Sequence, residues 1–216
     1  MLGASGCRTG VAMGCYERWV VPRLIDLGMR HPTLAGLRQR LVPLAHGRVL
    51  EIGVGSGLNL PHYGRAAQEV IGLDPSPQLL AKASRRARWI RQPIRLLEGV
   101  AEDVPLPDES VDTAVSTWTM CSVADPARVL AELRRVLRPG GRLLFLEHGR
   151  AEAPAVRSWQ DRVDPVWTRL AGGCHLNRSI DRLIAAAGFR LGPLETGHLV
   201  RGPRIFTYHY CGAAEA

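Results

Sequence analysis

Three alternating glycines directly follow an apolar run that contains one acid, in residues 49–57. The run, which includes Glu51, reads as a strand, and Gly53, Gly55 and Gly57 form the turn after it. Glycine has no Cβ, so such positions adopt turn conformations that are closed to other residues and let a ligand approach the main chain closely. We therefore predict a ligand site at the carboxyl end of this strand.

A second acid, Asp74, ends the next apolar run of the chain, residues 69–73. A carboxylate at this place can accept hydrogen bonds from both hydroxyls of a ribose. Together, the glycine turn and Asp74 predict an adenosine-type ligand that lies across the carboxyl ends of adjacent parallel strands. The alternative interpretation is an ordinary tight turn and an unrelated surface acid.

The spacing of the glycines separates this turn from a dinucleotide fingerprint. That fingerprint reads G-x-G-x-x-G, and its third glycine packs a helix against a strand. This chain reads G-x-G-x-G, and then residues 58–60 and a proline. An NAD-dependent oxidoreductase with a Rossmann sheet remains an alternative, but the missing third-glycine spacing weighs against it.

Alternating strands and helices are expected to position these residues. Apolar patterning predicts strands at 48–52, 70–73, 94–98, 111–117 and 142–147. It predicts helices from 58 onward, with an interruption at Pro61, at 77–89 and at 126–137. Ser76 can cap the second of these helices, because a serine side chain accepts from first-turn amides. This alternation predicts an α/β fold, doubly wound, with a mostly parallel sheet between two helical layers.

The flanking segments are expected to complete a single compact domain. Helical spacing at 16–29 and 32–44 predicts that residues 1–44 form an N-terminal helical cover over the ligand. Residues 148–178 lose their periodicity, and a helix at 179–187 follows them. Two last strands, 189–196 and 205–210, are expected to form an antiparallel pair at the C-terminal end.

The charge of the chain does not by itself indicate a nucleic-acid partner. The net charge is +8, but the basic residues are almost all arginines that are scattered along the 216 residues. They form no stripe with interleaved aromatic residues, so we expect no nucleic-acid partner. A non-catalytic module that senses a cofactor or binds nucleic acid remains an alternative. An acidic or thiol-bearing small substrate is compatible with the charge.

The five cysteines form no C-x-x-C pair and no Cys/His cluster at zinc spacing, so no metal site is expected. Free thiols are typical of a reducing cytoplasm. The first residues lack the apolar core of a signal peptide, and no stretch approaches membrane-spanning length. We therefore expect a soluble, cytoplasmic protein with no integral membrane segment.

Taken together, these signals resemble the class I S-adenosylmethionine-dependent methyltransferases, from residue 45 to the carboxyl end. Besides the glycine turn and Asp74, the likeness rests on residues 99–107, 110–112 and 137–141. It implies that residues 45–216 form a Rossmann-like methyltransferase domain with S-adenosylmethionine as cofactor. It also implies the cofactor contacts: the three glycines line the methionine and ribose portion, Asp74 holds the ribose hydroxyls, Glu51 attracts the methionine ammonium, and Ala101 and Glu102 border the adenine.

A narrower likeness lies beyond the cofactor half, in residues 119–123, 146–148, 164–167 and 172–178. These segments resemble the methyltransferase family that contains the animal alkyl-thiol S-methyltransferases and many bacterial proteins. The resemblance implies a small-molecule methyl acceptor, with a thiol favoured. The animal members carry a hydrophobic amino-terminal anchor that is not evident here, so we do not carry over a membrane location. A quinone-precursor carbon or a phospholipid amine remains an alternative acceptor, because residues 105–108 also occur in those relatives.

His148 is the candidate catalytic residue. Methyl transfer depends chiefly on aligning the acceptor, the methyl group and the departing sulfur. A thiol with a pKa of about 8.5 is already partly ionised at neutral pH and needs little base catalysis. An oxygen or carbon acceptor needs a base, and His148 follows the fifth strand at the ligand edge, where an imidazole suits that role. The alternative is a hydrogen-bonded histidine with no catalytic role.

Overall fold

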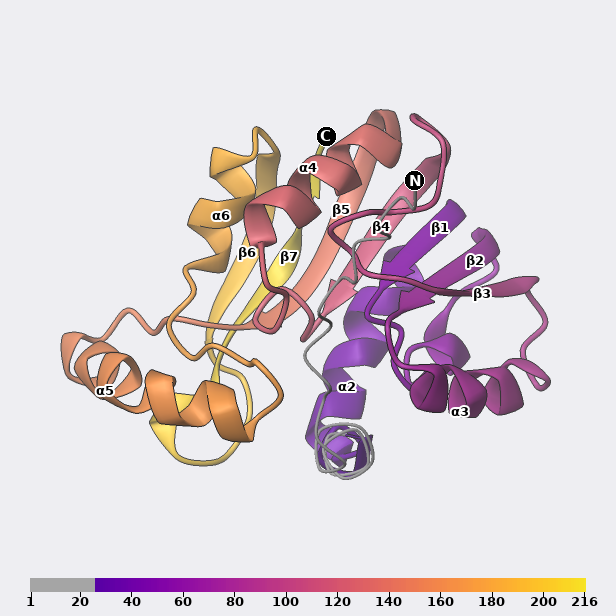
Figure 1. Ribbon diagram of the computed structural model, residues 1–216. Coiled ribbons are helices and arrows are strands. Elements are labelled where there is room, and N and C mark those ends of the chain that lie inside the picture. The colour runs from indigo at the N-terminus through magenta and orange to yellow at the C-terminus, as the bar shows by residue number, and fades with distance from the viewer. Residues whose placement is uncertain (1–25) are drawn as a thin grey trace, which may run out of the picture.

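The computed structural model describes residues 26–216, which build a seven-stranded sheet in the order β3-β2-β1-β4-β5-β7-β6 (Figure 1). Its strands are β1 (Gly47–Ile52), β2 (Ala67–Asp74), β3 (Ile94–Glu98), β4 (Val111–Thr117), β5 (Leu137–His148), β6 (Arg190–His198) and β7 (Tyr208–Glu215). Strands β1 to β5 run parallel to one another, whereas β7 lies antiparallel to both β5 and β6. The predicted α/β sheet with an antiparallel C-terminal pair is confirmed.

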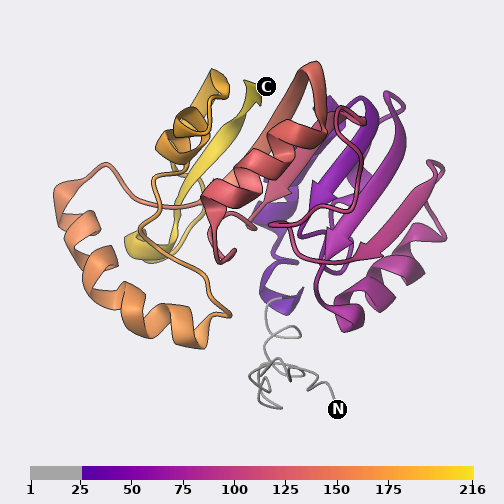
Figure 2. The same ribbon diagram turned by 45° about the horizontal axis from the view of Figure 1, so that its top comes forward.

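Helices cover both faces of the sheet (Figures 1 and 2). On one face, α2 (Pro32–Leu41) and α3 (Pro77–Ala87) pack over a core that includes Val49. On the other face, α4 (Pro126–Val136) and α6 (Ile180–Ala186) pack over a core that includes Leu50. Successive residues of a strand point to opposite faces, so the apolar run of β1 supplies both cores.

Polar side chains cap the first turns of α3 and α4. Ser76 Oγ accepts a hydrogen bond from the amide of Leu79 at 3.3 Å, which confirms the predicted cap of α3. At α4, the Asp125 carboxylate accepts from the amides of Ala127 and Arg128 at 3.0 and 3.1 Å. A polar cap of this kind satisfies first-turn amides that have no partner within the helix.

The helix predicted from residue 58 onward is wrong. The segment between β1 and β2 contains only a 3-10 turn, η3 (Leu60–His62). Pro61 has no amide proton to donate, and Gly64 destabilises a helix interior, so the short connection cannot continue as an α-helix.

The sequence reading missed α5 (Pro154–Leu170), a helix in the segment that showed no periodicity. The helix projects beyond the sheet, at the lower left of Figure 1, and contacts the short turn η4 (Arg204–Phe206). Trp159, Val166 and Leu170 are exposed on it. Apolar residues do recur at helical spacing along α5, from Val156 to Leu170, but Pro165 lies inside this pattern and is typical of a helix break.

Smaller differences lie at the ends of elements and at the amino terminus. Residues 138–141, expected to stop α4, already belong to β5, and η4 delays the start of β7 to Tyr208. The helix predicted at 16–29 lies mostly outside the described residues, as does much of the predicted cover 1–44. Within residues 26–216, no helix combines the length and apolar character needed to cross a bilayer.

The strand order reverses between β1 and β4, since β2 and β3 continue from one side of β1 and β4 and β5 lie on the other. In an open α/β sheet, ligands bind in the crevice outside the carboxyl ends of the strands at this point. The glycine turn follows β1 here, Asp74 ends β2 and His148 ends β5. The fold therefore brings the main predicted site residues to one edge.

Candidate active site

The three glycines after β1 all have positive φ, at 63°, 54° and 79°, but their surroundings differ. A Cβ on Gly53 would overlap the Thr119 side chain, and one on Gly57 would press against Leu60 and Ala83. A Cβ on Gly55 would meet only the Gly53 carbonyl oxygen, at 3.8 Å. Gly53 and Gly57 thus permit close packing within the protein, whereas Gly55 borders open space that a ligand can approach.

Asp74 is tied to this turn. Its carboxylate accepts hydrogen bonds from the amide of Gly55 at 2.9 Å and from the amide of Ser76 at 2.8 Å. Burial raises the pKa of Asp74, and the two amides oppose that rise. Each carboxylate oxygen accepts one of these bonds and has further lone-pair capacity. The acid is therefore held in place and suited to accept from ribose hydroxyls.

Glu51 lies under the turn and is almost fully buried. Its two carboxylate oxygens accept from Asn59 Nδ2 at 2.9 Å and from the Tyr63 hydroxyl at 2.7 Å. Burial raises the pKa of Glu51 to about 7, against the effect of these hydrogen bonds and of the nearby Arg38. Each oxygen accepts one of these bonds and, as in Asp74, has further lone-pair capacity. The sequence reading missed Asn59 and Tyr63, which carry no local signal.

Ala101 and Glu102 follow β3 at the same edge. Ala101 is buried in the core that contains α4. The Glu102 carboxylate accepts from the amides of Ala124 and Asp125, at 3.0 and 3.3 Å, and so holds the loop that leads into α4. Contact of these two residues with an adenine stays a prediction.

Asp26, which sequence reasoning missed, clamps the amino-terminal side of the described chain onto the glycine turn. Its buried carboxylate accepts from the hydroxyl of Ser56 within the turn, from Lys82 Nζ on α3 at 2.8 Å, and from Arg30 at 2.7 Å. Burial would raise the pKa of Asp26, but the hydrogen bonds from Lys82, Ser56 and Arg30 together lower it well below its usual range. The only sequence signal was the i, i+4 spacing of Asp26 and Arg30.

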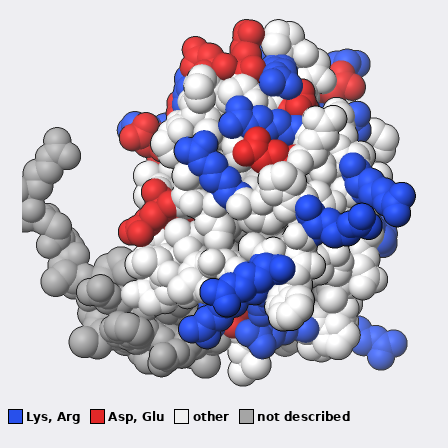
Figure 3. Space-filling view, turned by 90° about the vertical axis from the view of Figure 1, so that its right-hand side faces the viewer, with Lys and Arg blue, Asp and Glu red and all other residues white. Residues whose placement is uncertain are grey.

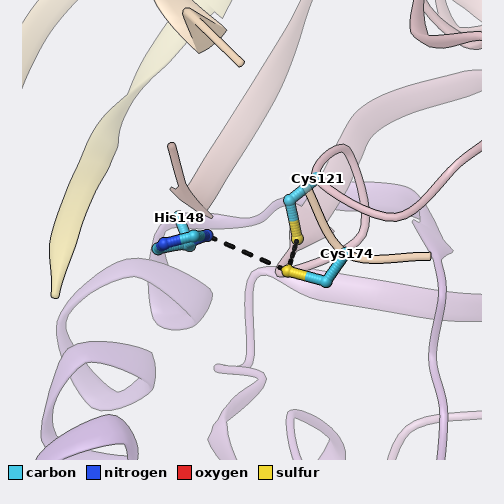
Figure 4. A group of neighbouring side chains, drawn as sticks. All are labelled: Cys121, His148 and Cys174. Atoms are coloured by element: carbon cyan, nitrogen blue, oxygen red, sulfur yellow. Dashed lines mark hydrogen bonds between the residues drawn. The ribbon is translucent and has the colours of Figure 1, made fainter. Parts of the chain in front are cut away.

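His148 is buried at the end of β5, and its Nδ1 lies 3.9 Å from the Cys174 Sγ (Figure 4). The Cys174 Sγ in turn lies 3.7 Å from the Cys121 Sγ. These residues come from β5, from the loop after α5 and from the loop after β4. The hydrogen bond between the two thiols raises the pKa of Cys121 and lowers that of Cys174, and His148 contributes to the second effect. The sequence reading missed this cluster, because no short spacing encodes it.

Hydrogen bonds fix the two cysteine loops against each other. The amide of His175 donates to the Cys121 carbonyl at 2.7 Å. Arg178 donates to the carbonyls of Met120 and Val123 at 2.7 and 2.8 Å. The Asp164 carboxylate contacts the two residues after Cys174: His175, through Nδ1 at 2.9 Å, and Leu176, through its amide at 2.6 Å.

The loop after β4 also contacts the glycine turn. Thr119 Oγ1 donates to the Ile52 carbonyl at 3.3 Å and lies against Gly53. The amide of Thr119 donates to the Glu147 carboxylate at 3.1 Å, beside Ser116 Oγ at 2.7 Å. Glu147 is fully buried, and burial raises its pKa to about 7. The cysteine–histidine cluster thus borders the edge where the glycine turn lies.

Comparisons with known proteins agree with this geometry. A family model described as "Methyltransferase domain" matches residues 50–145. The chain is 36% identical over 171 residues to human thiol S-methyltransferase TMT1A, a match that covers 74% of this chain and 69% of that protein. It is 34% identical over 139 residues to a phosphatidylethanolamine N-methyltransferase of Cereibacter sphaeroides, which covers 62% of this chain and 66% of that protein. The chain spans about two thirds of the length of these curated relatives, and 62% of a further thiol S-methyltransferase.

A solved structure has the same architecture over nearly the whole chain. It is a SAM-dependent methyltransferase of Thermotoga maritima, described as a possible histamine N-methyltransferase. The TM-score is 0.67 at 26% identity, and the alignment covers 93% of this chain and 97% of that one.

Proposed function

The chain belongs to the S-adenosylmethionine-dependent methyltransferases, and on that basis we propose that it transfers a methyl group to the sulfur of a small, apolar thiol. The observation that carries the cofactor part is the pairing of Gly55 with Asp74, which puts a bare stretch of main chain beside a fixed carboxylate. S-adenosylmethionine supplies a methyl group on a positively charged sulfur that is a good leaving group. The thiol part is supported by the match to the human thiol S-methyltransferase.

We propose that the residues at this edge divide the work of binding the cofactor. Gly53 and Gly57 shape the turn, Gly55 leaves room for close approach, and Asp74 accepts from the ribose hydroxyls. Glu51, buried under the turn, is proposed to attract the methionine ammonium, whose positive charge would favour the ionised form of this acid. Ala101 and Glu102 are proposed to border the adenine. We also propose that residues 1–44 form a cover and residues 45–216 the catalytic domain. The contacts of Asp26 with Ser56 and Lys82 support this division.

The residues that follow β4 and β5 are proposed to receive the acceptor. Alignment of reacting atoms can supply about 7–11 kcal/mol of a barrier, so a rigid acceptor site matters more than strong base catalysis. The hydrogen bonds from His175 and Arg178 to the Cys121 loop support such rigidity. His148 is the catalytic candidate, as the side chain at the end of β5 that promotes loss of the thiol proton.

A panel of acceptors tests this proposal. The protein is incubated with methyl-labelled S-adenosylmethionine and, separately, with benzenethiol, phenol, a quinol or phosphatidylethanolamine vesicles, and products are identified by mass spectrometry. The proposal expects label on the sulfur of benzenethiol and much less on phenol, its matched oxygen analogue. Label only on a quinol carbon or a lipid amine, or on no acceptor, would overturn the thiol assignment.

A phospholipid amine is the second candidate acceptor. The match to the phosphatidylethanolamine N-methyltransferase favours it, and so do the apolar side chains that α5 exposes. An oxidoreductase using NAD has no comparable support, because the glycine spacing departs from the dinucleotide fingerprint.

We further propose a cytoplasmic protein without a nucleic-acid partner. Cys121 and Cys174 are free thiols although their sulfurs are neighbours, which suits a reducing compartment. On the face in Figure 3, basic side chains lie in separate groups with uncharged surface between them. Such a distribution gives no continuous track for a phosphate backbone.

A further inference from the structure

We propose that Cys121, His148 and Cys174 form a site for a zinc-type metal ion, whose fourth coordination position is open to the sulfur of the methyl acceptor. The metal site stands on the geometry of these three residues. Its role toward the acceptor rests on the proposed function. The sequence spacing predicts no metal site, because the three ligands come from separate segments and only the fold brings them together.

The ligand atoms are already spaced as a zinc ion requires. One atom from each side chain lies within 4.8 Å of the others. In a tetrahedral site with zinc–sulfur bonds of about 2.3 Å, two sulfurs lie about 3.8 Å apart. The Cys121 and Cys174 sulfurs are 3.7 Å apart, and His148 Nδ1 is 3.9 Å from the Cys174 sulfur. The two sulfurs thus need almost no shift, whereas the histidine nitrogen must move closer to them, because a tetrahedral site places it about 3.6 Å from each sulfur.

The segments that carry these ligands are held in place. His148 lies in β5 opposite His209 of β7, within a continuous ladder. The Cys121 carbonyl accepts from the amide of His175, next to Cys174, and Arg178 donates to both sides of the Cys121 loop. Such outer contacts orient metal ligands and reduce the ordering that binding must impose.

The ligand set matches a catalytic rather than a structural zinc site. Two cysteines and one histidine leave one of four positions for an exogenous ligand, whereas structural sites are closed by a fourth side chain. Cys121 and His148 are buried, whereas Cys174 is partly exposed, so a ligand would reach the cluster from the side of Cys174. Two thiolates also balance the charge of a divalent ion.

The position of the cluster connects it with methyl transfer. Thr119 lies two residues before Cys121 and contacts both Gly53 and the Ile52 carbonyl of the glycine turn. The cluster therefore lies beside the edge where the cofactor is proposed to bind.

A metal ion at this site would activate the acceptor thiol by favouring loss of its proton. On binding, the thiol releases its proton to solvent, since a coordinated thiol is deprotonated outright. The thiolate lone pair forms a bond to the methyl carbon as the bond from that carbon to the cofactor sulfur breaks, and its electron pair stays on that sulfur. The product is a neutral thioether, a weaker ligand than a thiolate. His148 thus promotes loss of the proton by holding the metal rather than by accepting the proton itself.

Cobalt titration tests the site without relying on activity. The reduced full-length protein is treated with chelator, freed of it, and titrated anaerobically with Co²⁺, with Zn²⁺ as competitor. We expect one equivalent of tetrahedral Co²⁺ with a sulfur-to-cobalt charge-transfer band. Cys121→Ser and Cys174→Ser should abolish the band, and His148→Asn should weaken binding at least about tenfold. Cys211→Ser, a matched change on β7, should leave it intact.

Two results would overturn the metal site: no tetrahedral cobalt in the wild type, or binding that Cys121→Ser and Cys174→Ser leave unchanged. Circular dichroism shows whether each variant is folded, and the wild-type stoichiometry decides the matter if a variant is not.

Adding benzenethiol to the cobalt protein tests the acceptor role. A further thiolate ligand should strengthen the charge-transfer band, whereas phenol should not. An unchanged band would refute the acceptor role while the metal site stands. Failure of the protein to take up S-adenosylmethionine would instead refute the proposed function and leave the cobalt result unaffected.

Discussion

The amide of Gly55 donates a hydrogen bond of 2.9 Å to the Asp74 carboxylate and so joins the turn after β1 to the end of β2. The bond orients the acid before any ligand arrives, and it sets the acid beside the one glycine of the turn whose Cβ position is open. A pre-oriented acceptor next to bare main chain lowers the ordering cost of ligand binding.

Replacing Asp74 with Ala should weaken S-adenosylmethionine binding. Hydrogen bonds to charged groups contribute about 1.5–3 kcal/mol each, so the loss of affinity should be at least about tenfold. Binding of the cofactor to wild type and variant, followed by intrinsic fluorescence, measures the change. Glu98→Ala is the matched control, because Glu98 is an exposed acid that pairs with Asp74 in the β2–β3 register. Equal affinity of the Asp74 variant and the wild type would refute the ribose assignment.

Gly55→Leu should block the cofactor site and leave the fold intact. The new side chain would occupy the open space beside the turn, at the cost of some strain from the positive φ of 54°. Gly140→Leu controls for that strain, since Gly140 has a φ of 76° and open surroundings at the start of β5. Competition with a fluorescent cofactor analogue should show binding lost only at residue 55. If both variants bind alike, close approach at Gly55 is excluded.

Asp26→Asn should loosen the contact between the amino-terminal side and the glycine turn. The loss of charge leaves Lys82 and Arg30 without their partner, and we expect the free energy of unfolding to fall by about 1–3 kcal/mol. The low end of this range applies, because Lys82 and Arg30 are 34% and 50% exposed and water screens their interaction with Asp26. Asp108→Asn, in an exposed pair with Arg135, should change stability little. Urea denaturation compares them, and equal effects of the two changes would rule out the clamp.

The stability of the protein should depend on pH through Glu147. Its pKa rises from 4.5 to about 7 on folding, so the folded state holds the extra proton between these values. The contribution of Glu147 to stability is therefore fully present below pH 4.5, and it is lost as the pH rises through about 7. Glu147→Gln stays neutral, so it should match the wild type in acid and exceed it by up to about 3 kcal/mol in mild alkali. Parallel denaturation curves for the two proteins across this range would contradict the assignment.

Local patterns in the sequence were enough to predict most of the sheet. The patterns at 94–98 and 111–117 predict the observed bounds of β3 and β4, although β3 is a partly exposed edge strand and β4 is largely buried. The helix expected from residue 58 failed since Pro61 and the short connection override its pattern. Helix α5 was missed because Pro165 interrupts an apolar pattern that otherwise has helical spacing.

Some residues of the candidate site could also be predicted from local sequence patterns, whereas others could not. Gly55 and Asp74 could be found because each directly follows an apolar run that ends in the sheet. The contact between Cys121 and Cys174 could not, because the two residues are far apart in the chain and are joined only when the loops after β4 and α5 meet. Asp26 similarly meets Ser56 only through the tertiary fold.

Calorimetric titration of the reduced, full-length protein with S-adenosylmethionine tests the central claim most directly. The account predicts saturable uptake at a single site per chain, and similar uptake of the demethylated product, S-adenosylhomocysteine. If the folded protein gives no saturable heat with either compound at any accessible concentration, the glycine turn and Asp74 do not form a cofactor site and the account is wrong.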